Sequence, residues 1–498
     1  AFRSNPAGDS SDEISAMSYL ELLKLVSPEA VVVLTALIVL AIGLTSAKAA
    51  RISPLVTLIG LAVAIVAVVM LPSKVMLFSE MIVITPLTSL FKIVLLSLAA
   101  ITVLLIPSTL PNRSEFLAML LLATIGLMLL VGSEELLMIF IGLELTGLSL
   151  YVMTAFDKSD ERSAEAGLKY FLFGSTASAF TLFGLSLVYG MTGTTGLAAI
   201  AEKLSASPAQ PLLAAGLIMT LVGFGFKIAA APFHLWAPDV YQGAPIPAAA
   251  FIASGSKVGS FVVLGKIVLV GFAPLHGSAA WHAAVAGWVP MLATLAALSI
   301  ILGNLVALAQ TNVRRLLAYS AIAHGGYTLL GLIASGCDGF GATLFYTTIY
   351  ALTLLGAFGV VGLVRRETGG DDFRNFSGLS SRSPLLAGCM TIFILSLAGL
   401  PPLAGFFGKF YLFSAAFRAG GNHGLLWLVA VALFGSLISL YYYLMILKAI
   451  FADNPKSDLV RGRPDFLQQL TVSGLALAVL LLGILPGALV SLINASLL

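Results

Sequence analysis

Residues 223–245, GFGFKIAAAPFHLWAPDVYQGAP, place a charge and a helix breaker inside an apolar segment. Lys227 stands within the apolar run, and Pro232 follows five residues later, ahead of a histidine and an aspartate. Because proline has no N–H, the carbonyl group four residues before it loses its helical partner. Non-helical backbone is tolerated at membrane depth only where protein or water covers it. In a membrane, this stretch therefore predicts an interrupted helix with a hydrated pocket beside Lys227.

The composition of the whole chain indicates a membrane protein. Hydrophobic residues make up 59% of the 498 residues, charged residues make up 10%, and the mean hydropathy is +1.04. Soluble proteins carry about a quarter charged residues. Apolar runs of roughly 18 to 25 residues recur along the chain, long enough to cross a hydrocarbon layer of about 30 Å as helices. Since the sequence lacks the alternation of barrel strands, we expect an all-α polytopic membrane protein.

Apolar runs and the residues that interrupt them predict about fourteen transmembrane helices. We expect these near residues 28–45, 53–71, 85–106, 114–131, 133–155, 162–190, 211–231, 247–271, 286–309, 315–335, 340–364, 384–417, 425–451 and 467–494. The seventh is interrupted at Pro232, and the twelfth at Pro401 and Pro402 in GLPPLAG. Residues 1–24 are expected to form a polar N-terminal tail.

Lys and Arg residues gather in alternate connections between these segments. One set of connections holds fourteen of them, and the other holds only Lys74, Lys203 and Arg418. Because positive residues favour the cytoplasmic side, we expect the first set to face the cytoplasm, with both termini on the outer, periplasmic side of the cell's inner (plasma) membrane. Cys337 and Cys389 then lie near opposite surfaces, which excludes a disulfide bond between them.

A second stretch, GLPPLAGFFGKF, repeats the elements of the first and places Lys409 beside Gly and Pro. Five segments separate the two stretches, and because five is odd the second enters the membrane from the opposite face. Interrupted helices at matching positions of two inverted units indicate a transport site near the midplane. We therefore expect helices 1–3 over residues 25–110, one five-helix repeat over 111–275, an inverted repeat over 276–455, and helix 14 over 456–498.

Four ionisable residues lie deep in their segments. An ionised side chain at the bilayer centre costs at least about 2.5 kcal/mol, so it must be paired, hydrated, neutralised or able to reach an interface. Glu144 is about eleven residues from either end of its segment and is the only deep carboxylate, so we expect it to be the counter-charge of Lys227. Lys257 and Lys409 are also deep. For all four, function is favoured over a purely structural bond or ion pair.

Other ionisable residues are less distinctive. Lys169 lies a turn or two from the inner end of its segment, where snorkelling competes with function. His234 and His324 suit a proton relay because histidine titrates near neutrality, but a neutral packing role is equally compatible with each. We interpret the remaining charges near span ends as snorkelling lysines (Lys92, Lys266, Lys448) or as solvated or capping carboxylates (Glu134, Glu135, Asp239).

The sequence offers no energy source of its own. It contains no Walker loop, no dinucleotide fingerprint, and no Cys or His spacing typical of a metal site. Uphill transport must therefore be driven by an ion gradient or by a partner. We expect the lipid bilayer, and not nucleic acid, to be the environment of the chain.

Four stretches closely resemble subunit N of bacterial proton-translocating NADH:quinone oxidoreductase (complex I), the counterpart of mitochondrial and chloroplast subunit 2. They are IGLELTGLSLY, the stretch 223–245 quoted above, ILGNLVALAQTNVRRLLAYSAIAHGGY and LAGLPPLAGFFGKFYLF. The resemblance runs from about residue 25 to the C-terminus. It implies fourteen transmembrane helices in an antiporter-like fold, with two inverted five-helix repeats and discontinuous helices 7 and 12.

The resemblance also implies a function and a set of residues. The family translocates protons across the membrane, coupled to quinone reduction elsewhere in its complex. Matched motif by motif, its proton path falls on Glu144, Lys169, Lys227, Lys257 and Lys409, with His234 and His324 along the same polar axis. It implies no redox catalysis and no cofactor in this chain itself, with flavin, iron–sulfur clusters and quinone on other subunits. The implied partners are the antiporter-like subunit M and small membrane subunits.

Three alternatives remain open on the sequence alone. The chain could be a subunit of a multisubunit cation/proton antiporter of the Mrp type, or the membrane arm of a related hydrogenase complex. It could also be a structural spacer that buries charge without conducting. The related subunit M carries a glutamate at the position of Lys409, so the lysine favours the subunit N family.

Overall fold

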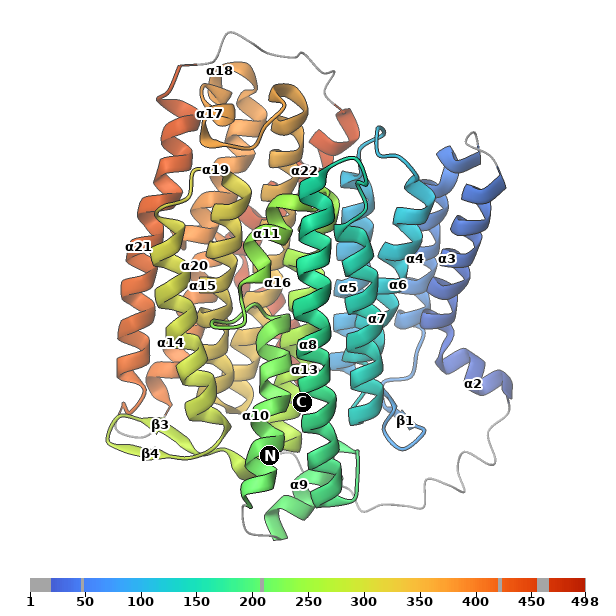
Figure 1. Cartoon of the computed structure of the whole chain (residues 1–498), viewed down its shortest axis with the longest axis vertical. Coiled ribbons are helices and arrows are strands. Elements are labelled where there is room, and N and C mark those ends of the chain that lie inside the picture. The colour runs from blue at the N-terminus through green and yellow to red at the C-terminus, as the bar shows by residue number, and fades with distance from the viewer. Residues whose placement is uncertain (1–18, 46–48, 207–209, 420–422, 455–464, 498) are drawn as a thin grey trace.

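Helices of membrane-spanning length make up most of the chain (Figure 1). The computed structural model describes residues 19–45, 49–206, 210–419, 423–454 and 465–497. Within these ranges, twelve helices are long and apolar enough to cross a membrane. Eleven are α3 (Ser27–Thr45), α4 (Ser53–Val69), α5 (Pro86–Leu105), α6 (Arg113–Val131), α7 (Leu136–Thr154), α8 (Glu161–Thr192), α14 (Trp288–Ala307), α15 (Val313–Ala334), α16 (Gly336–Thr368), α21 (Leu426–Phe451) and α22 (Phe466–Ile484).

The remaining long helix, Ile246–Gly271, contains two π-helical turns. It consists of α12 (Ile246–Phe251), the π-helical turn η2 (Ile252–Ser256), α13 (Lys257–Lys266) and a second π-helical turn η3 (Ile267–Gly271). The π-helix is rare and often marks a functional site, because it disturbs the regular ladder of backbone hydrogen bonds. Lys257 is the first residue after one such turn.

Two further spans are interrupted, as expected. The seventh consists of α10 (Pro211–Lys227) and α11 (Trp236–Gly243), and the twelfth consists of α19 (Pro384–Ala398) and α20 (Ala404–Arg418). Each interruption contains a cis peptide bond, Ala231–Pro232 in one and Pro401–Pro402 in the other. In Figure 1, α10 lies below α11 whereas α19 lies above α20, so the two spans run in opposite directions.

These elements confirm the expected helical membrane fold. The twelve uninterrupted and two interrupted helices of the described residues correspond to the fourteen predicted segments. The opposite directions of the two broken helices are consistent with inverted repeats. The repeats themselves and the domain boundaries stay predictions. Of the predicted polar tail, residues 1–18 lie outside the described residues, and α2 (Tyr19–Leu25) follows them.

Short elements occupy the two ends of the bundle (Figure 1). One end carries α9 (Leu197–Ala206) and two antiparallel hairpins, β1–β2 (Val75–Leu77, Ile82–Ile84) and β3–β4 (Ser278–Ala280, Ala283–Val285). The other end carries α17 (Phe373–Phe376) and α18 (Leu379–Arg382), and it is the end predicted to face the cytoplasm. Four of the positive residues behind that prediction, Lys48, Lys456, Arg461 and Arg463, lie outside the described residues.

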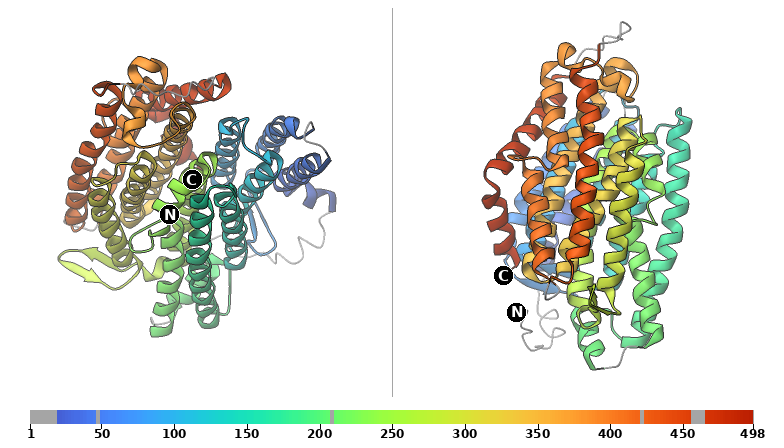
Figure 2. Two further views of the ribbon diagram at one scale, coloured as in Figure 1. Left: turned by 45° about the horizontal axis from the view of Figure 1, so that its top comes forward. Right: turned by 90° about the vertical axis from the view of Figure 1, so that its left-hand side faces the viewer.

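Helices at the centre of the bundle are almost fully covered. The composite span Ile246–Gly271 and α15 are each 94% buried, whereas α3, α4 and α22 are 33% buried. The blue N-terminal helices lie at one edge of the bundle in both Figure 1 and Figure 2. Large apolar side chains exposed on outer helices, such as Leu34, Leu433 and Phe434, fit contact with lipid chains. The lysine-bearing composite span is therefore shielded from lipid.

Three other elements complete the described chain: the 3-10 turns η1 (Ala49–Ile52) and η4 (Ala273–Leu275), and the C-terminal helix α23 (Pro486–Leu497). Cys337 is exposed and Cys389 is buried, and neither forms a disulfide bond, as predicted.

Candidate functional site

Glu144 and Lys227 share a small cavity where the first interrupted helix passes α7. Lys227 is the last residue of α10, and its Nζ donates a hydrogen bond to the carbonyl oxygen of Leu143 at 3.2 Å. Glu144 accepts a short hydrogen bond from the Oγ of Ser178 on α8. The cavity measures about 10 Å³, roughly room for one water molecule. Leu143, Glu144, Ser178 and Lys227 all line it, together with Thr181.

Glu144 and Lys227 line one cavity, as expected for a carboxylate and its counter-charge, but they do not form a direct ion pair. Among the described residues, Glu144 and Lys227 are not within the 4.0 Å of an ion pair. The ammonium group of Lys227 bonds the carbonyl oxygen of Leu143, one residue before Glu144, and the carboxylate of Glu144 turns towards α8. Gly147 makes room for the lysine, since a Cβ atom there would lie 2.8 Å from its Nζ. The ammonium group also lies 5.8 Å from the ring centre of Tyr151.

Protein atoms cover part of the interruption between α10 and α11. The backbone N–H of Ala231 donates to the Oγ of Ser299 on α14 at 2.8 Å. The indole N–H of Trp236 donates to the carbonyl oxygen of Phe226 at 3.1 Å. These bonds replace helical partners that the break removes. Pro232 is exposed, and His234 is half-buried with an Nδ1 atom that has no hydrogen-bond partner among the described residues.

Lys257 lies at the centre of the bundle, with its side chain directed to α15. Its Nζ donates to the carbonyl oxygen of Ala321 at 2.5 Å, and it lies 5.5 Å from the ring centre of Tyr350. Only 3% of Lys257 is exposed. Ala321 comes three residues before His324 on the same helix, so Lys257 and His324 contact one short stretch of α15.

His324 is fully enclosed by tyrosines. Its Nδ1 is 2.5 Å from the hydroxyl of Tyr346, and its Nε2 is 3.0 Å from the hydroxyl of Tyr443. The Tyr443 hydroxyl in turn shares a short hydrogen bond with Ser320. A buried imidazole with both nitrogens bonded to hydroxyl groups has partners that can donate or accept a proton.

Two more tyrosines join His324 to the lysines on either side. The ring of Tyr350 lies 5.0 Å from the His324 ring and 5.5 Å from the Nζ of Lys257. The ring of Tyr327 lies 5.6 Å from the His324 ring and 5.2 Å from the Nζ of Lys409. The order Lys257, Tyr350, His324, Tyr327, Lys409 therefore forms a continuous buried line, which we call the central line.

Lys409 ends the central line in the second half of the twelfth span. Its Nζ donates to the carbonyl oxygen of Ala398 and to the Oγ of Ser436, both at 3.0 Å. Ala398 is the last residue of α19, so the break exposes its carbonyl group for this bond. The break at Pro401 and Pro402 thus places Lys409 against freed backbone, whereas Lys227 bonds a carbonyl group within α7.

The structure places Lys169 away from the central line. Its Nζ lies 2.6 Å from Glu165 on its own helix and 2.7 Å from Asp239 on α11. The side chain is 39% exposed. Lys169 is therefore paired with carboxylates near the α17–α18 end of the bundle rather than with other members of the predicted path.

Two lysines interpreted as snorkelling are in fact buried ion-pair partners. Lys92 is 1% exposed and lies 2.6 Å from Glu29, and Lys266 is 4% exposed and lies 3.2 Å from Glu134. Lys266 also donates to the carbonyl oxygen of Val131, the last residue of α6, at 2.9 Å. Carbonyl groups at a helix end lack intrahelical partners, so a buried lysine is stabilised there.

The other interpretations near span ends have mixed outcomes. Lys448 is exposed, as a snorkelling residue should be. Glu135 caps α7, since its carboxylate accepts the N–H groups of Leu137 and Met138. Asp239 is not merely solvated, because it is paired with both Lys169 and Arg315, the latter at 2.7 Å.

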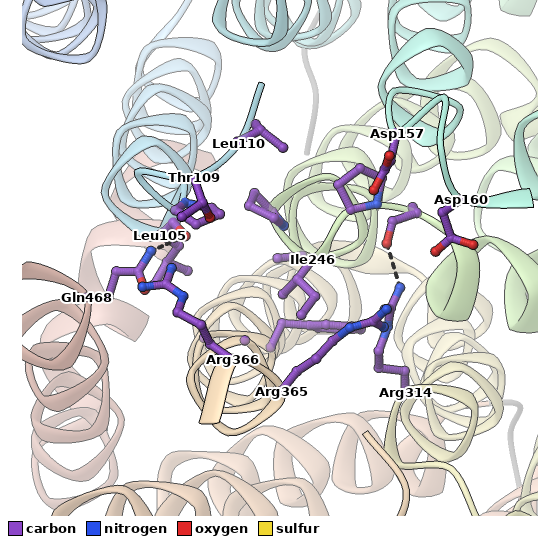
Figure 3. A pocket seen from close by; sticks show the side chains of 18 of the residues that line it. Leu105, Thr109, Leu110, Asp157, Asp160, Ile246, Arg314, Arg365, Arg366 and Gln468 are labelled. Atoms are coloured by element: carbon purple, nitrogen blue, oxygen red, sulfur yellow. Dashed lines mark hydrogen bonds between the residues drawn. The ribbon is translucent and has the colours of Figure 1, made fainter. Parts of the chain in front are cut away.

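Two cavities open at opposite ends of α16. The first, of about 420 Å³, lies at the α17–α18 end and is shown in Figure 3. Asp157 and Asp160 lie on one side of it, with Arg365 and Arg366 on the side of α16. Its lining includes Ala250, seven residues before Lys257 on the same span.

The second cavity, of about 450 Å³, is lined by the first turns of α16 and the last turns of α20. Its lining includes Asp338, Arg418 and Phe410, and Phe410 directly follows Lys409. The two ends of the central line therefore each have a polar cavity nearby, on opposite sides of the bundle.

Comparison with known proteins gives consistent likenesses. Residues 133–439 match a family described as NADH:quinone oxidoreductase/Mrp antiporter, TM. The chain is 45% identical to NADH-quinone oxidoreductase subunit N 2 of Acidobacterium capsulatum, over 96% of this chain and 99% of that protein. It resembles a chain of respiratory complex I from Thermus thermophilus with a TM-score of 0.78 at 34% identity, covering 93% of this chain and 98% of the other. A chain of the Mrp complex from Dietzia sp. DQ12-45-1b shares the fold, with a TM-score of 0.81 at 21% identity and coverage of 94% and 96%.

Proposed function

Because the chain belongs to the NADH-quinone oxidoreductase subunit N family, we propose that it is an antiporter-like membrane-arm subunit of a complex I and translocates protons while quinone is reduced elsewhere in the complex. Flavin, iron–sulfur clusters and quinone belong to other subunits in this proposal. Its neighbours are subunit M and small membrane subunits. The complex lies in the inner membrane, with the α17–α18 end towards the cytoplasm and both termini outside.

The central line is the observation that carries this proposal. It holds two buried lysines, Lys257 and Lys409, without a carboxylate within 4.0 Å of either Nζ among the described residues. A buried cation whose only partners are carbonyl, hydroxyl and aromatic groups is easily neutralised by losing its proton. His324 between them has bonded hydroxyl groups on both ring nitrogens, which suits the passage of a proton.

The two cavities supply the ends of the route. The lining of the first cavity includes the buried Ala250, two helical turns from Lys257, and the π-helical turn η2 lies between the two residues. Water in the second cavity reaches Phe410, next to Lys409. Protons therefore enter from the α17–α18 end, pass along the central line, and leave at the opposite end of α16.

Glu144 and Lys227 form the input that controls this line in the proposal. Their shared cavity is large enough for one water molecule, so the carboxylate can move from Ser178 towards the ammonium group without a rearrangement of the backbone. In that position Glu144 would hold Lys227 charged. Its return to Ser178 would release this stabilisation and favour proton transfer onwards.

Replacing Lys409 tests the proposal. Lys409→Ala removes the last protonatable group of the central line, and we expect the rate of proton transfer through this subunit to fall by about 10²-fold. The complex should then lose this subunit's share of the protons translocated per electron. The measurement uses the whole complex in proteoliposomes, with quinone reduction and internal acidification followed together. Glu144→Ala should behave similarly. The matched control is Lys448→Ala, which removes an exposed lysine and should leave the ratio unchanged.

The rival functions predict different results in the same assay. A structural spacer predicts that Lys409→Ala lowers the amount of assembled complex but leaves protons per electron at the normal value. An Mrp-type antiporter predicts sodium transport by vesicles that lack a peripheral redox arm. Normal pumping by an assembled Lys409→Ala complex would overturn the proposed function.

A further inference from the structure

Asp239 connects three helices through one carboxylate. It lies on α11, the second half of the first interrupted helix. Its Oδ2 lies 2.7 Å from the Nζ of Lys169 on α8, and its Oδ1 lies 2.7 Å from the Nη1 of Arg315 on α15. Both carboxylate oxygens are therefore occupied by cations from different helices, and the sequence interpretation of Asp239 as a solvated residue does not cover this.

The helix that carries Asp239 depends on such contacts for its position. α11 has eight residues and is separated from α10 by the interruption at residues 228–235. Isolated helices shorter than about twelve residues are marginal, so tertiary contacts must hold this one. It packs against α8 and α15, the two helices that supply the cations. Arg315 adds a second bond to α11, to the Oε1 of Gln242 at 3.0 Å.

The two cations hold α11 from two different helices. Arg315 attaches it to α15, and Lys169 attaches it to α8. The other charged group facing Lys169 is Glu165, which lies on α8 itself and cannot hold α11.

The attached helices also carry the two parts of the proposed path. α8 carries Ser178, which bonds Glu144, and α15 carries His324 of the central line. Movement of α11 relative to α8 would open or close the interruption that follows Lys227. Loss of the contact between Asp239 and Lys169 would thus be felt at the break without any direct contact between Lys169 and Lys227.

We propose that Asp239 is a positioning residue of the proton path, whose carboxylate docks α11 between α8 and α15 through its ion pairs with Lys169 and Arg315. This inference rests on the proposed proton translocation for its functional consequence. The docking itself is a structural claim and can be tested without any transport assay.

The first test measures protons per electron in the reconstituted complex. Asp239→Asn keeps the shape of the side chain but removes its charge, and we expect the ratio to fall at least about fivefold. Asp239→Glu should restore at least half of it. Glu165→Gln is the matched control, because it removes the other carboxylate on Lys169 but leaves α11 docked, and it should keep the normal ratio. A merely structural role predicts less assembled complex at an unchanged ratio, which would overturn the inference.

The second test measures the docking directly. Leu235 is 61% exposed and directly precedes α11, so a spin label attached after Leu235→Cys, with Cys337→Ser, reports the mobility of this helix end. Asp239→Asn and Lys169→Gln should each increase the label's mobility, with the larger increase in Asp239→Asn because it also breaks the contact with Arg315. Their combination should add nothing to Asp239→Asn alone, because that variant already lacks the contact with Lys169. Glu165→Gln should leave it unchanged. Unchanged mobility in Asp239→Asn, or fully additive increases, would overturn the docking even if Lys409→Ala abolishes pumping.

Discussion

Lys227 and Lys409 each lie beside a helix break, but on opposite sides of it along the chain and among different groups. Lys227 ends α10 before its break and shares a cavity with the carboxylate of Glu144. Lys409 lies in α20 after its break, and among the described residues its ammonium group contacts Ala398, Ser436 and the Tyr327 ring. The first lysine has a movable counter-charge close by, whereas the second is held by neutral groups.

In the proposed function, this difference gives the two breaks different tasks. A charge near a carboxylate can be stabilised or released by a small movement, which suits control. A lysine among neutral groups depends on water and on neighbouring cations for its protonation state, which suits proton release next to a cavity. The break beside Lys227 would then serve as the input of the proposed path, and the break beside Lys409 as its output.

Glycines beside the two lysines provide the sharpest way to separate the sites. Gly399 has a φ of 83°, and a Cβ atom there would lie 2.9 Å from the Cδ of Lys409. Gly399→Ala therefore strains the backbone by about 1–2 kcal/mol and also displaces the lysine. We expect proton translocation to fall about tenfold, which corresponds to 1.4 kcal/mol.

Gly147→Ala is the corresponding change at the first site and should have a smaller effect. Gly147 is helical, so alanine costs no backbone strain there, and the flexible end of Lys227 must shift while the Tyr151 hydroxyl, 3.1 Å from the added Cβ, gives slightly. Proton translocation should fall about threefold, which corresponds to a rise in the activation free energy of less than about 1 kcal/mol. Equal losses of proton translocation in Gly399→Ala and Gly147→Ala, measured in the same proteoliposomes, would contradict the expectation that the site of Lys409 tolerates less displacement than the site of Lys227.

The tyrosines around His324 give two effects of different size, one of them the smallest expected. Tyr346→Phe removes the hydroxyl group bonded to the Nδ1 of His324, which is worth about 1 kcal/mol, and should slow proton translocation about fivefold. Tyr350→Phe keeps the ring next to Lys257 and removes a hydroxyl group that has no hydrogen-bond partner among the described residues. It should stay within about twofold of the normal rate. A larger loss of proton translocation in Tyr350→Phe than in Tyr346→Phe would show that the Tyr350 hydroxyl, rather than the Tyr346 hydroxyl, passes the proton to His324.

The sequence was most informative where a charge and a helix breaker occur together. Lys227 with Pro232, and Lys409 with Pro401, are local signals, and the structure places both lysines at interruptions as expected. The pairing of Lys227 was predicted less well. Depth along a helix shows that Lys227 and Glu144 can meet, but rotation of the two helices decides whether the lysine bonds the carboxylate or the neighbouring carbonyl.

Contacts between distant segments explain the remaining differences. Lys92 and Lys266 lie near span ends, and residue counting cannot show that Glu29 and the end of α6 would enclose them. Asp239 meets Lys169 across 70 residues of sequence. The tyrosines of the central line carry no distinguishing signal in a helix rich in apolar residues, since aromatic residues there usually pack in the core. Only the arrangement of α13, α15 and α20 shows that they link three ionisable groups.

The central line is tested most directly by comparing two buried lysines, one on it and one off it. Lys257→Gln and Lys92→Gln each remove a charge that is at most 3% exposed. Lys92→Gln leaves Glu29 without its partner and should destabilise the protein by about 3–5 kcal/mol, but protons per electron should stay normal in the complex that assembles. Lys257→Gln should slow proton transfer through this subunit at least about tenfold and so remove its share of the protons translocated per electron. Normal pumping by Lys257→Gln, or an equal loss in both variants, would contradict the account.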